Sequence, residues 1–313
     1  MSAKVFFQDF EPAIREQFSR AVAGAGSEAQ HLQLELGKQR RESAFAAEMS
    51  VTPPAGSVLA TWAAVGSLWA CAQGFTRAGR RMYEGKRAGA RSRLSIEEDP
   101  GLKTGLDFLV FCQRLHTNDF PEQAGTPKWV SYLPPPQLAP DDDDGKNGNI
   151  LFLEALGWIF RHEVAHVTLQ HAVVADSLKA GNDADRQATL WLRGALRPDP
   201  DRAPGSKPSA TEIQLEARAI ATGVALFWLV MVDHRARNRA VTHPLASERA
   251  HRCFQTLEVR EDSAAAEILS DTIQAWLDPE GEWAPPGGYP NALAALGDAL
   301  DRLHSKRHDP KIV

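Results

Sequence analysis

The sequence predicts a mainly α-helical fold of the α+β class, a helical zincin-like domain with a small β element. Several segments carry apolar residues at helical spacing, including 13–23 and the long stretch 149–174. Clusters of proline and glycine separate such segments, as in 52–56 and 197–209. Only two short apolar runs have the length and residue types of strands. Helices therefore dominate the expected fold.

The first hundred residues are expected to be helical. A helix start is predicted at Phe10-Glu11-Pro12, followed by a polar helix over 30–50 and an apolar helix over 58–75. The apolar segment is uncharged for 18 residues, but Ala, Gly and Ser dominate it, which favours a buried helix over a membrane span. The basic segment 77–93 is interpreted as a solvated helix face, because it lacks the repeated aromatic residues that stack on bases.

The remaining elements follow from the same signals. The two strand candidates are 106–111 and 128–133, and the acidic run 140–148 is expected to be a flexible loop. A break is predicted at 180–183, and a helix is expected to start at Ser209 or Thr211. Further helices are expected over 186–196, 246–258, 263–277 and 291–304.

Length and composition suggest one domain in a reducing compartment. The 313 residues suffice for a substantial core, and we expect a helical N-terminal region (1–100), a catalytic core (101–260) and a helical C-terminal region (261–313). The net charge of −5 gives no argument for nucleic acid binding. The three cysteines are far apart and odd in number, so we do not expect a disulfide framework. We therefore expect a cytoplasmic location.

The chemistry is concentrated in His162-Glu163-Val164-Ala165-His166, an H-E-x-x-H motif. Histidines four residues apart lie on one face of a helix, so His162 and His166 can bind one metal ion from one rigid element. Glu163 is placed to act on a water bound to that metal. The alternative is a buried helix whose histidines make ordinary hydrogen bonds.

A catalytic zinc site needs a third protein ligand, and the sequence offers three candidates. His171 lies five residues after His166, on another face of the helix, and is disfavoured. Glu212 and Glu216 are four residues apart on a later helix, so one can bind the metal while the other orients a ligating histidine. Acidic residues at this position would also stabilise the helix dipole without any role in metal binding.

The order of these motifs resembles that of the gluzincin metallopeptidases, over about 155–252. H-E-x-x-H is followed by Glu212-Ile213-Gln214-Leu215-Glu216, similar to an E-x-x-A-D pattern, and then by Thr242-His243-Pro244 and Arg249. The nearest resemblance is to the Lit-type phage exclusion peptidases, and the last two motifs are also similar to those of CAAX prenyl endopeptidases. The resemblance implies that Glu212 is the third zinc ligand and Glu216 its supporting acid. It also implies that His243 stabilises the oxyanion and that Arg249 braces the supporting acid.

The resulting hypothesis is a zinc-dependent endopeptidase with Glu163 as the general base. The resemblance implies a protein or peptide substrate, a regulatory or activating protein, and a role in bacterial defence against phage. It also implies that an edge strand beside the metal helix pairs with the substrate backbone. Two alternatives remain: a catalytically silent, zinc-stabilised sensor or protein-interaction module, and a membrane-associated peptidase. Nucleic acid is not expected as a partner.

Overall fold

The computed structural model confirms the mainly helical prediction, with a small sheet. It describes residues 4–37, 49–52, 56–87, 96, 98–117, 129–169, 177–198, 207–233, 245–278 and 288–306. The helices are α1 (Lys4–Phe7), α2 (Glu11–Ala25), α3 (Trp62–Arg87), α4 (Pro100–Thr117), α5 (Asp143–Thr168), α6 (Ser177–Arg193), α7 (Ala210–Asp233), α8 (Ala246–Leu257), α9 (Ala264–Leu277) and α10 (Ala292–Lys306). Two short 3-10 helices, η1 (Gln8–Phe10) and η2 (Ser27–Ala29), flank α2.

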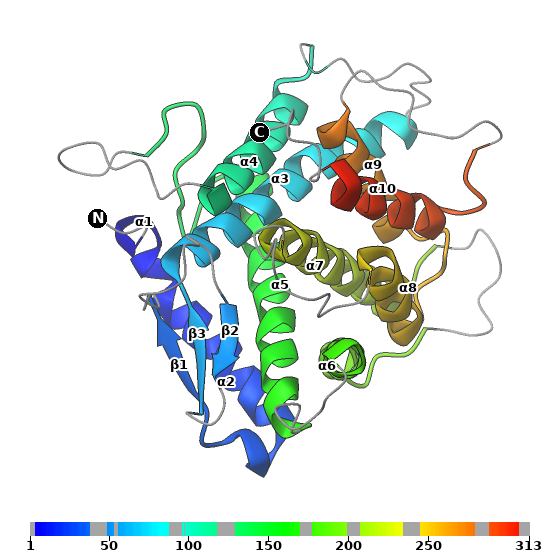
Figure 1. The fold of residues 1–313 in the computed structure, drawn as a ribbon. Helices are drawn as coiled ribbons and strands as arrows, with labels where there is room; N and C mark the ends of the chain where they lie inside the picture. Colours follow the sequence, from blue (N-terminus) through cyan, green and yellow to red (C-terminus); the bar gives the residue numbers. More distant parts are fainter. Residues whose placement is uncertain are drawn as a thin grey trace.

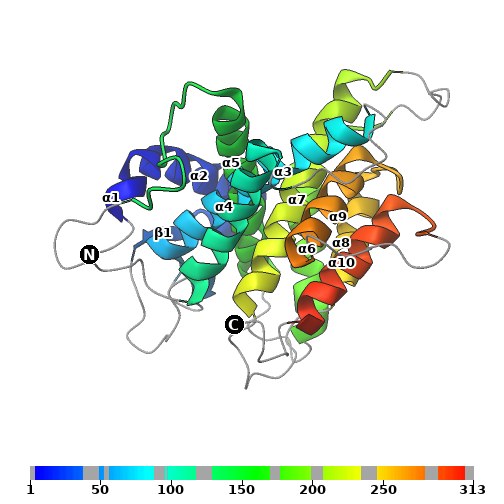
Figure 2. The same cartoon turned by 90° about the horizontal axis from the view of Figure 1, so that it is seen from above.

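Helix α5 forms the centre of the molecule and carries the H-E-x-x-H motif. It packs against α2 and the sheet on one side and against α6 and α7 on another, while α3 crosses it (Figure 1). Seen from above, α1 and α2 lie on one flank of the α3, α4 and α5 group, and α6 to α10 lie on the other (Figure 2). Large apolar side chains on several faces of α5 are fully buried, among them Phe152, Trp158 and Phe160. The motif is therefore held on a rigid core helix.

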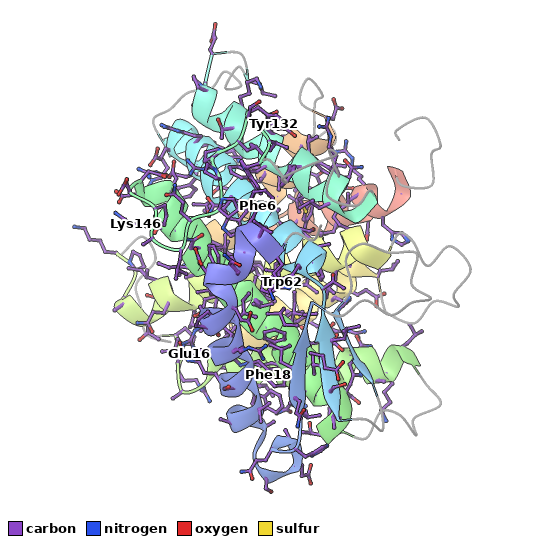
Figure 3. The ribbon with its side chains drawn as sticks, turned by 90° about the vertical axis from the view of Figure 1, so that its left-hand side faces the viewer. Phe6, Glu16, Phe18, Trp62, Tyr132 and Lys146 are labelled. Atoms are coloured by element: carbon purple, nitrogen blue, oxygen red, sulfur yellow. The ribbon has the colours of Figure 1, made fainter. Side chains whose placement is uncertain are left out.

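The sheet has three short strands: β1 (Gln33–Leu36), β2 (Met49–Thr52) and β3 (Ser57–Ala60). β3 is central, pairing in parallel with β1 and antiparallel with β2. β2 is an edge strand, and both β2 and β3 contact α5. Trp62 lies where β3 leads into α3, and Phe18 of α2 lies near the strands (Figure 3). The sheet thus covers the face of α5 that also packs against α2.

The strand predictions were wrong in position. The segment 106–111 lies inside α4, whose buried Leu102, Leu106 and Leu109 follow helical spacing, and 129–133 forms turns. The strands instead occupy 33–36 and 49–52, within or at the end of the predicted polar helix, and 57–60, at the start of the predicted apolar helix. A short apolar run buried on all sides has no period that separates helix from strand, and tertiary packing decided each case.

The acidic run 140–148 is not a flexible loop, because α5 begins within it at Asp143. The Asp142 side chain accepts a hydrogen bond from the Gly145 amide and caps the helix. Arg77 and Arg80 on α3 each lie 3.0 Å from a carboxylate oxygen of Asp142 and Asp144 respectively. The first part of the basic segment therefore anchors α5 to α3.

Helix α6 runs without interruption through the predicted break at 180–183. Ala180, Ala184, Ala188 and Leu192 form a buried stripe at helical spacing. A single glycine in a helix costs only about 1 kcal/mol, which such packing offsets. The predictions for α2, α7, α8, α9 and α10 agree with the structure to within a few residues.

The apolar segment 58–75 and the apolar helix α7 both belong to the core. Most of 58–75 is buried, as part of β3 and α3. Among the described helices, one stretch, Ala210–Met231, is long and apolar enough to cross a membrane, and 61% of its apolar window is buried within the structure. Such burial is typical of a core helix.

Candidate active site

The two motif histidines face each other on consecutive turns of α5. Their Nε2 atoms are 3.1 Å apart, and the ring planes meet at 82°. Two nitrogens bound to one tetrahedral zinc ion at 2.0–2.1 Å would be separated by about 3.3 Å. A hydrogen bond between the rings would give a similar distance. The pair therefore has a separation that suits a shared metal ion.

Asp185 on α6 holds the other side of the His162 ring. Its Oδ1 lies 2.8 Å from His162 Nδ1, and both side chains are almost completely buried. A carboxylate at this position favours the tautomer in which Nδ1 carries the proton. His162 Nε2 then presents its lone pair towards His166, which is the form that a metal ion requires.

Arg249 on α8 neutralises the buried Asp185. Its Nε and Nη2 donate to Oδ2 and Oδ1 of Asp185 at 2.7 and 2.8 Å. Burial alone would raise the pKa of Asp185, but Arg249 and His162 outweigh this effect and hold the pKa below its ordinary value. Asp185 is therefore ionised at neutral pH, and one buried charge pair links α5, α6 and α8.

Two neighbouring side chains reinforce this arrangement. Trp158 stacks on His162, with ring centroids 5.6 Å apart, and its Nε1 donates to Thr189 at 3.0 Å. The Thr189 hydroxyl donates to the carbonyl of Asp185.

Burial and the charge of Asp185 raise the pKa of Cys253 to about 12, so this thiol is neutral and unsuited to binding a metal.

The proposed general base and the predicted glutamates lie in different surroundings. Glu163 is buried on α5 beside His162, with 8% of its surface exposed. Glu212 accepts a hydrogen bond from the Ser209 amide, and its own amide donates to Ser209 Oγ, which makes a capping box at the start of α7. Glu216 accepts from the amide of Ala265 at the start of α9. The structure thus gives both glutamates contacts at helix starts, and their predicted roles at the metal stay predictions.

Within the described residues, no group of three His, Cys, Asp or Glu side chains is arranged to hold a metal ion. One other polar atom is notable. Asn182 Oδ1, one turn before Asp185 on α6, is buried and has no hydrogen-bond partner in the described structure. Leaving such an atom unpaired costs about 1–3 kcal/mol. Two histidines with facing nitrogens are donors that suit a zinc ion.

The sequence prediction missed Asp185, the buried carboxylate that contacts His162. Arg249 braces the buried acid Asp185, whereas the resemblance implied that it braces Glu216. A signal was present, since Ala184-Asp185 matches the end of the E-x-x-A-D pattern better than Leu215-Glu216 does. Gly181 occupies the position of the first Glu in that pattern, and the predicted helix break concealed the match. His171 and His243 lie outside the described residues.

Comparisons with known proteins agree with a peptidase resemblance. The sequence profile of the family described as Peptidase U49 matches residues 58–269, a range that includes the site. The chain is 32% identical over 133 residues to the cell death peptidase of Escherichia coli (strain K12), which covers 42% of this chain. The match spans 41% of that relative's length. No solved structure matches.

Proposed function

Because the chain belongs to the peptidase U49 family, we propose that it is a zinc-dependent endopeptidase that cleaves a protein substrate. The observation that carries the proposal is the histidine pair, with Nε2 atoms 3.1 Å apart and His162 oriented by the Asp185–Arg249 charge pair. A carboxylate behind a ligating histidine raises its basicity and fixes its ring. A pair of histidines serving only as packing would not need a buried arginine to support them.

The mechanism follows from the positions of the side chains. A bound zinc ion would polarise the scissile carbonyl and lower the pKa of its water towards about 7. Glu163 takes the proton of the attacking water and delivers it to the leaving amine. His162 and His166 hold the ion, while Asp185 keeps the Nδ1 proton of His162 in place. His243 remains the predicted contributor to oxyanion stabilisation.

The edge strand β2 is a candidate binding site for an extended substrate peptide. Within the described part of the chain, β2 pairs with β3 and with no strand on its other side, and it contacts the helix that carries the motif. An extended peptide can add to such an edge through main-chain hydrogen bonds, which bind many sequences with similar affinity. We expect the substrate to lie along β2 in an extended conformation. This replaces the two predicted strands, which the structure does not contain.

The biological setting is proposed from resemblance. The E. coli relative is called a cell death peptidase, and the motif order resembles that of phage exclusion peptidases. An enzyme of this kind would act in the cytoplasm on a host protein and would depend on a regulatory or activating partner. The sparing use of cysteine fits that compartment.

A second candidate is a catalytically silent zinc-binding sensor. The observation that favours it is Gly181, which stands where the resembling pattern has a metal-binding Glu. Such a protein would bind zinc through His162 and His166 without turnover. The biological activity of such a sensor would not require Glu163.

The test compares Glu163→Gln with Glu154→Gln, a control on the same helix. We expect Glu163→Gln to keep the zinc content of the wild type and to lose cleavage of host proteins, whereas Glu154→Gln keeps both. His166→Ala should lose zinc. Cleavage can be followed by mass spectrometry of new protein termini in cells expressing each variant. Equal cleavage by Glu163→Gln and wild type would refute the role of Glu163, and zinc binding without any wild-type cleavage would favour the sensor.

A further inference from the structure

We propose that Thr189 is a positioning residue for His162, the proposed metal ligand, and that it acts through the indole ring of Trp158. The inference rests on the proposed zinc site and deepens it, because it names the side chains that hold the plane of one ligand ring. Neither Thr189 nor Trp158 belongs to the H-E-x-x-H motif or to the other patterns in which the chain resembles known peptidases. The contacts of the two side chains carry the assignment.

The hydrogen bond to Asp185 holds one corner of the His162 ring and leaves its plane poorly restrained. Oδ1 of Asp185 lies 2.8 Å from Nδ1. Hydrogen-bond angles vary widely, and the χ2 angle of histidine has a broad distribution, so this bond alone does not fix the ring plane. A change of plane displaces Nε2, the atom that faces His166. A metal site tolerates errors of only about 0.2 Å in its ligand distances, so the plane needs a second restraint.

Trp158 lies one turn before His162 on α5 and covers one face of the imidazole. The two ring planes differ by 28°, and the ring centroids are 5.6 Å apart. Both side chains are buried. Stacked rings in a close-packed interior restrict each other's rotation. Trp158 can hold the plane of His162 only if the indole is itself fixed.

Thr189, a buried residue of α6, fixes the indole. Trp158 Nε1 donates to Thr189 Oγ1 at 3.0 Å. The hydroxyl proton has two possible acceptors, the Asp185 carbonyl oxygen at 2.7 Å and Cys253 Sγ at 3.4 Å. The carbonyl is the nearer and stronger acceptor, so the proton points to it and a lone pair remains for the indole. Asp185 and Thr189 are one turn apart, so α6 holds His162 directly at Nδ1 and indirectly through the stacked indole.

The test measures the zinc affinity of the full chain by competition with a chromophoric chelator. Thr189→Val keeps the shape of the side chain but leaves the buried indole N–H unpaired, and should weaken zinc binding about tenfold or more. Thr189→Ser keeps the hydroxyl and should stay within about threefold of wild type. Trp158→Phe removes the other end of the same bond and should also weaken zinc binding. The double variant Trp158→Phe/Thr189→Val should bind zinc no more weakly than the weaker single variant, because the two substitutions remove one interaction.

Trp228→Phe is the matched control for loss of a buried indole hydrogen bond. Trp228 is also buried, and its Nε1 donates to Ser67 Oγ at 2.9 Å, between α7 and α3. This substitution should lower the stability of the chain while the zinc affinity stays within about twofold of wild type. Cobalt-substituted protein provides a second measurement. Its visible absorption bands should shift in Thr189→Val, where a ligand ring moves, and should be unchanged in Trp228→Phe.

The outcomes separate a positioning role from a structural one. Zinc affinity of Thr189→Val that falls no further than that of Trp228→Phe would overturn the assignment and leave the proposed peptidase intact. Equal losses in Thr189→Val and Thr189→Ser would also overturn it, because the hydroxyl would then have no role. If Thr189→Val does not fold, Trp158→Phe is compared with Trp228→Phe by the same criterion. Failure of the wild-type chain to bind zinc would overturn both the assignment and the proposed zinc peptidase.

Discussion

Substitutions in the Asp185–Arg249 pair should distinguish its contribution to the stability of the fold from its contribution to zinc binding. Asp185→Ala leaves the Arg249 guanidinium buried, with only 3% of its side chain exposed, and without its carboxylate. Breaking a buried pair in this way costs about 3–5 kcal/mol. Since domains are typically stable by about 5–15 kcal/mol, the variant should lose a large part of its stability. For a chain of 313 residues, this corresponds to a decrease in Tm of about 5–8 °C.

The same substitution should weaken zinc binding, because His162 loses the group that orients its ring. Removal of such a supporting residue typically lowers metal affinity about 10–100-fold. The double variant Asp185→Leu/Arg249→Met removes both charges and should regain most of the stability. It should not regain the zinc affinity, since Leu cannot accept a hydrogen bond from Nδ1–H of His162.

The assays are urea unfolding of the zinc-free chains and chelator competition for zinc, with Asp183→Ala as the exposed control on the same helix. Wild-type stability of Asp185→Ala would refute the description of a buried, coupled pair. Recovery of zinc affinity in the double variant would show that Asp185 supports the fold and does not position His162.

Two further predictions concern acid and the start of α7. The pKa of Asp185 is lower in the folded chain than its ordinary value of about 3.9, so its contribution to stability is complete above about pH 4 and is lost as the pH falls below that value. Urea unfolding between pH 5 and pH 3 should therefore show a smaller loss of stability for Asp185→Asn than for wild type, and equal losses would contradict the pKa direction. Glu212→Ala should lower stability by about 0.3–1.5 kcal/mol through loss of the capping box while zinc stoichiometry stays unchanged. Zinc analysis showing depleted metal in that variant would instead return Glu212 to the ligand set.

The sequence was informative where a local rule decided the structure. The start of α7 next to Ser209 follows from a capping residue, and the helices near the C-terminus follow from apolar periodicity. The residues that make up each of these signals lie close together in the sequence. The pairing of two histidines on one helix also follows from spacing alone. Such features do not depend on the rest of the chain.

The sequence was uninformative where distant segments decided the outcome. The 106–111 run became helical because α4 packs along α3, with Gly105 fitting against the backbone of Ala78. The partner of Arg249 lies on α6, and no spacing rule connects residues so far apart. A helix prediction broken at 180–183 removed Asp185 from consideration, although its Ala-Asp context was visible. Contacts between helices are set by the complete fold, which is why the sequence did not show that Arg249 of α8 contacts Asp185 of α6.

The link between Asp185 and Arg249 also bears on how the protein is made. Arg249 is synthesised about 60 residues after Asp185, a delay of about 3–12 s during translation. During that interval the nascent chain holds the whole H-E-x-x-H motif, but the carboxylate behind His162 has no counter-charge that would allow it to be buried. His162 should therefore acquire its oriented ring only when α8 has left the ribosome and docked. Loading of the proposed metal ion would then be a late event, and a chain released before α8 would contain the motif without the oriented histidine.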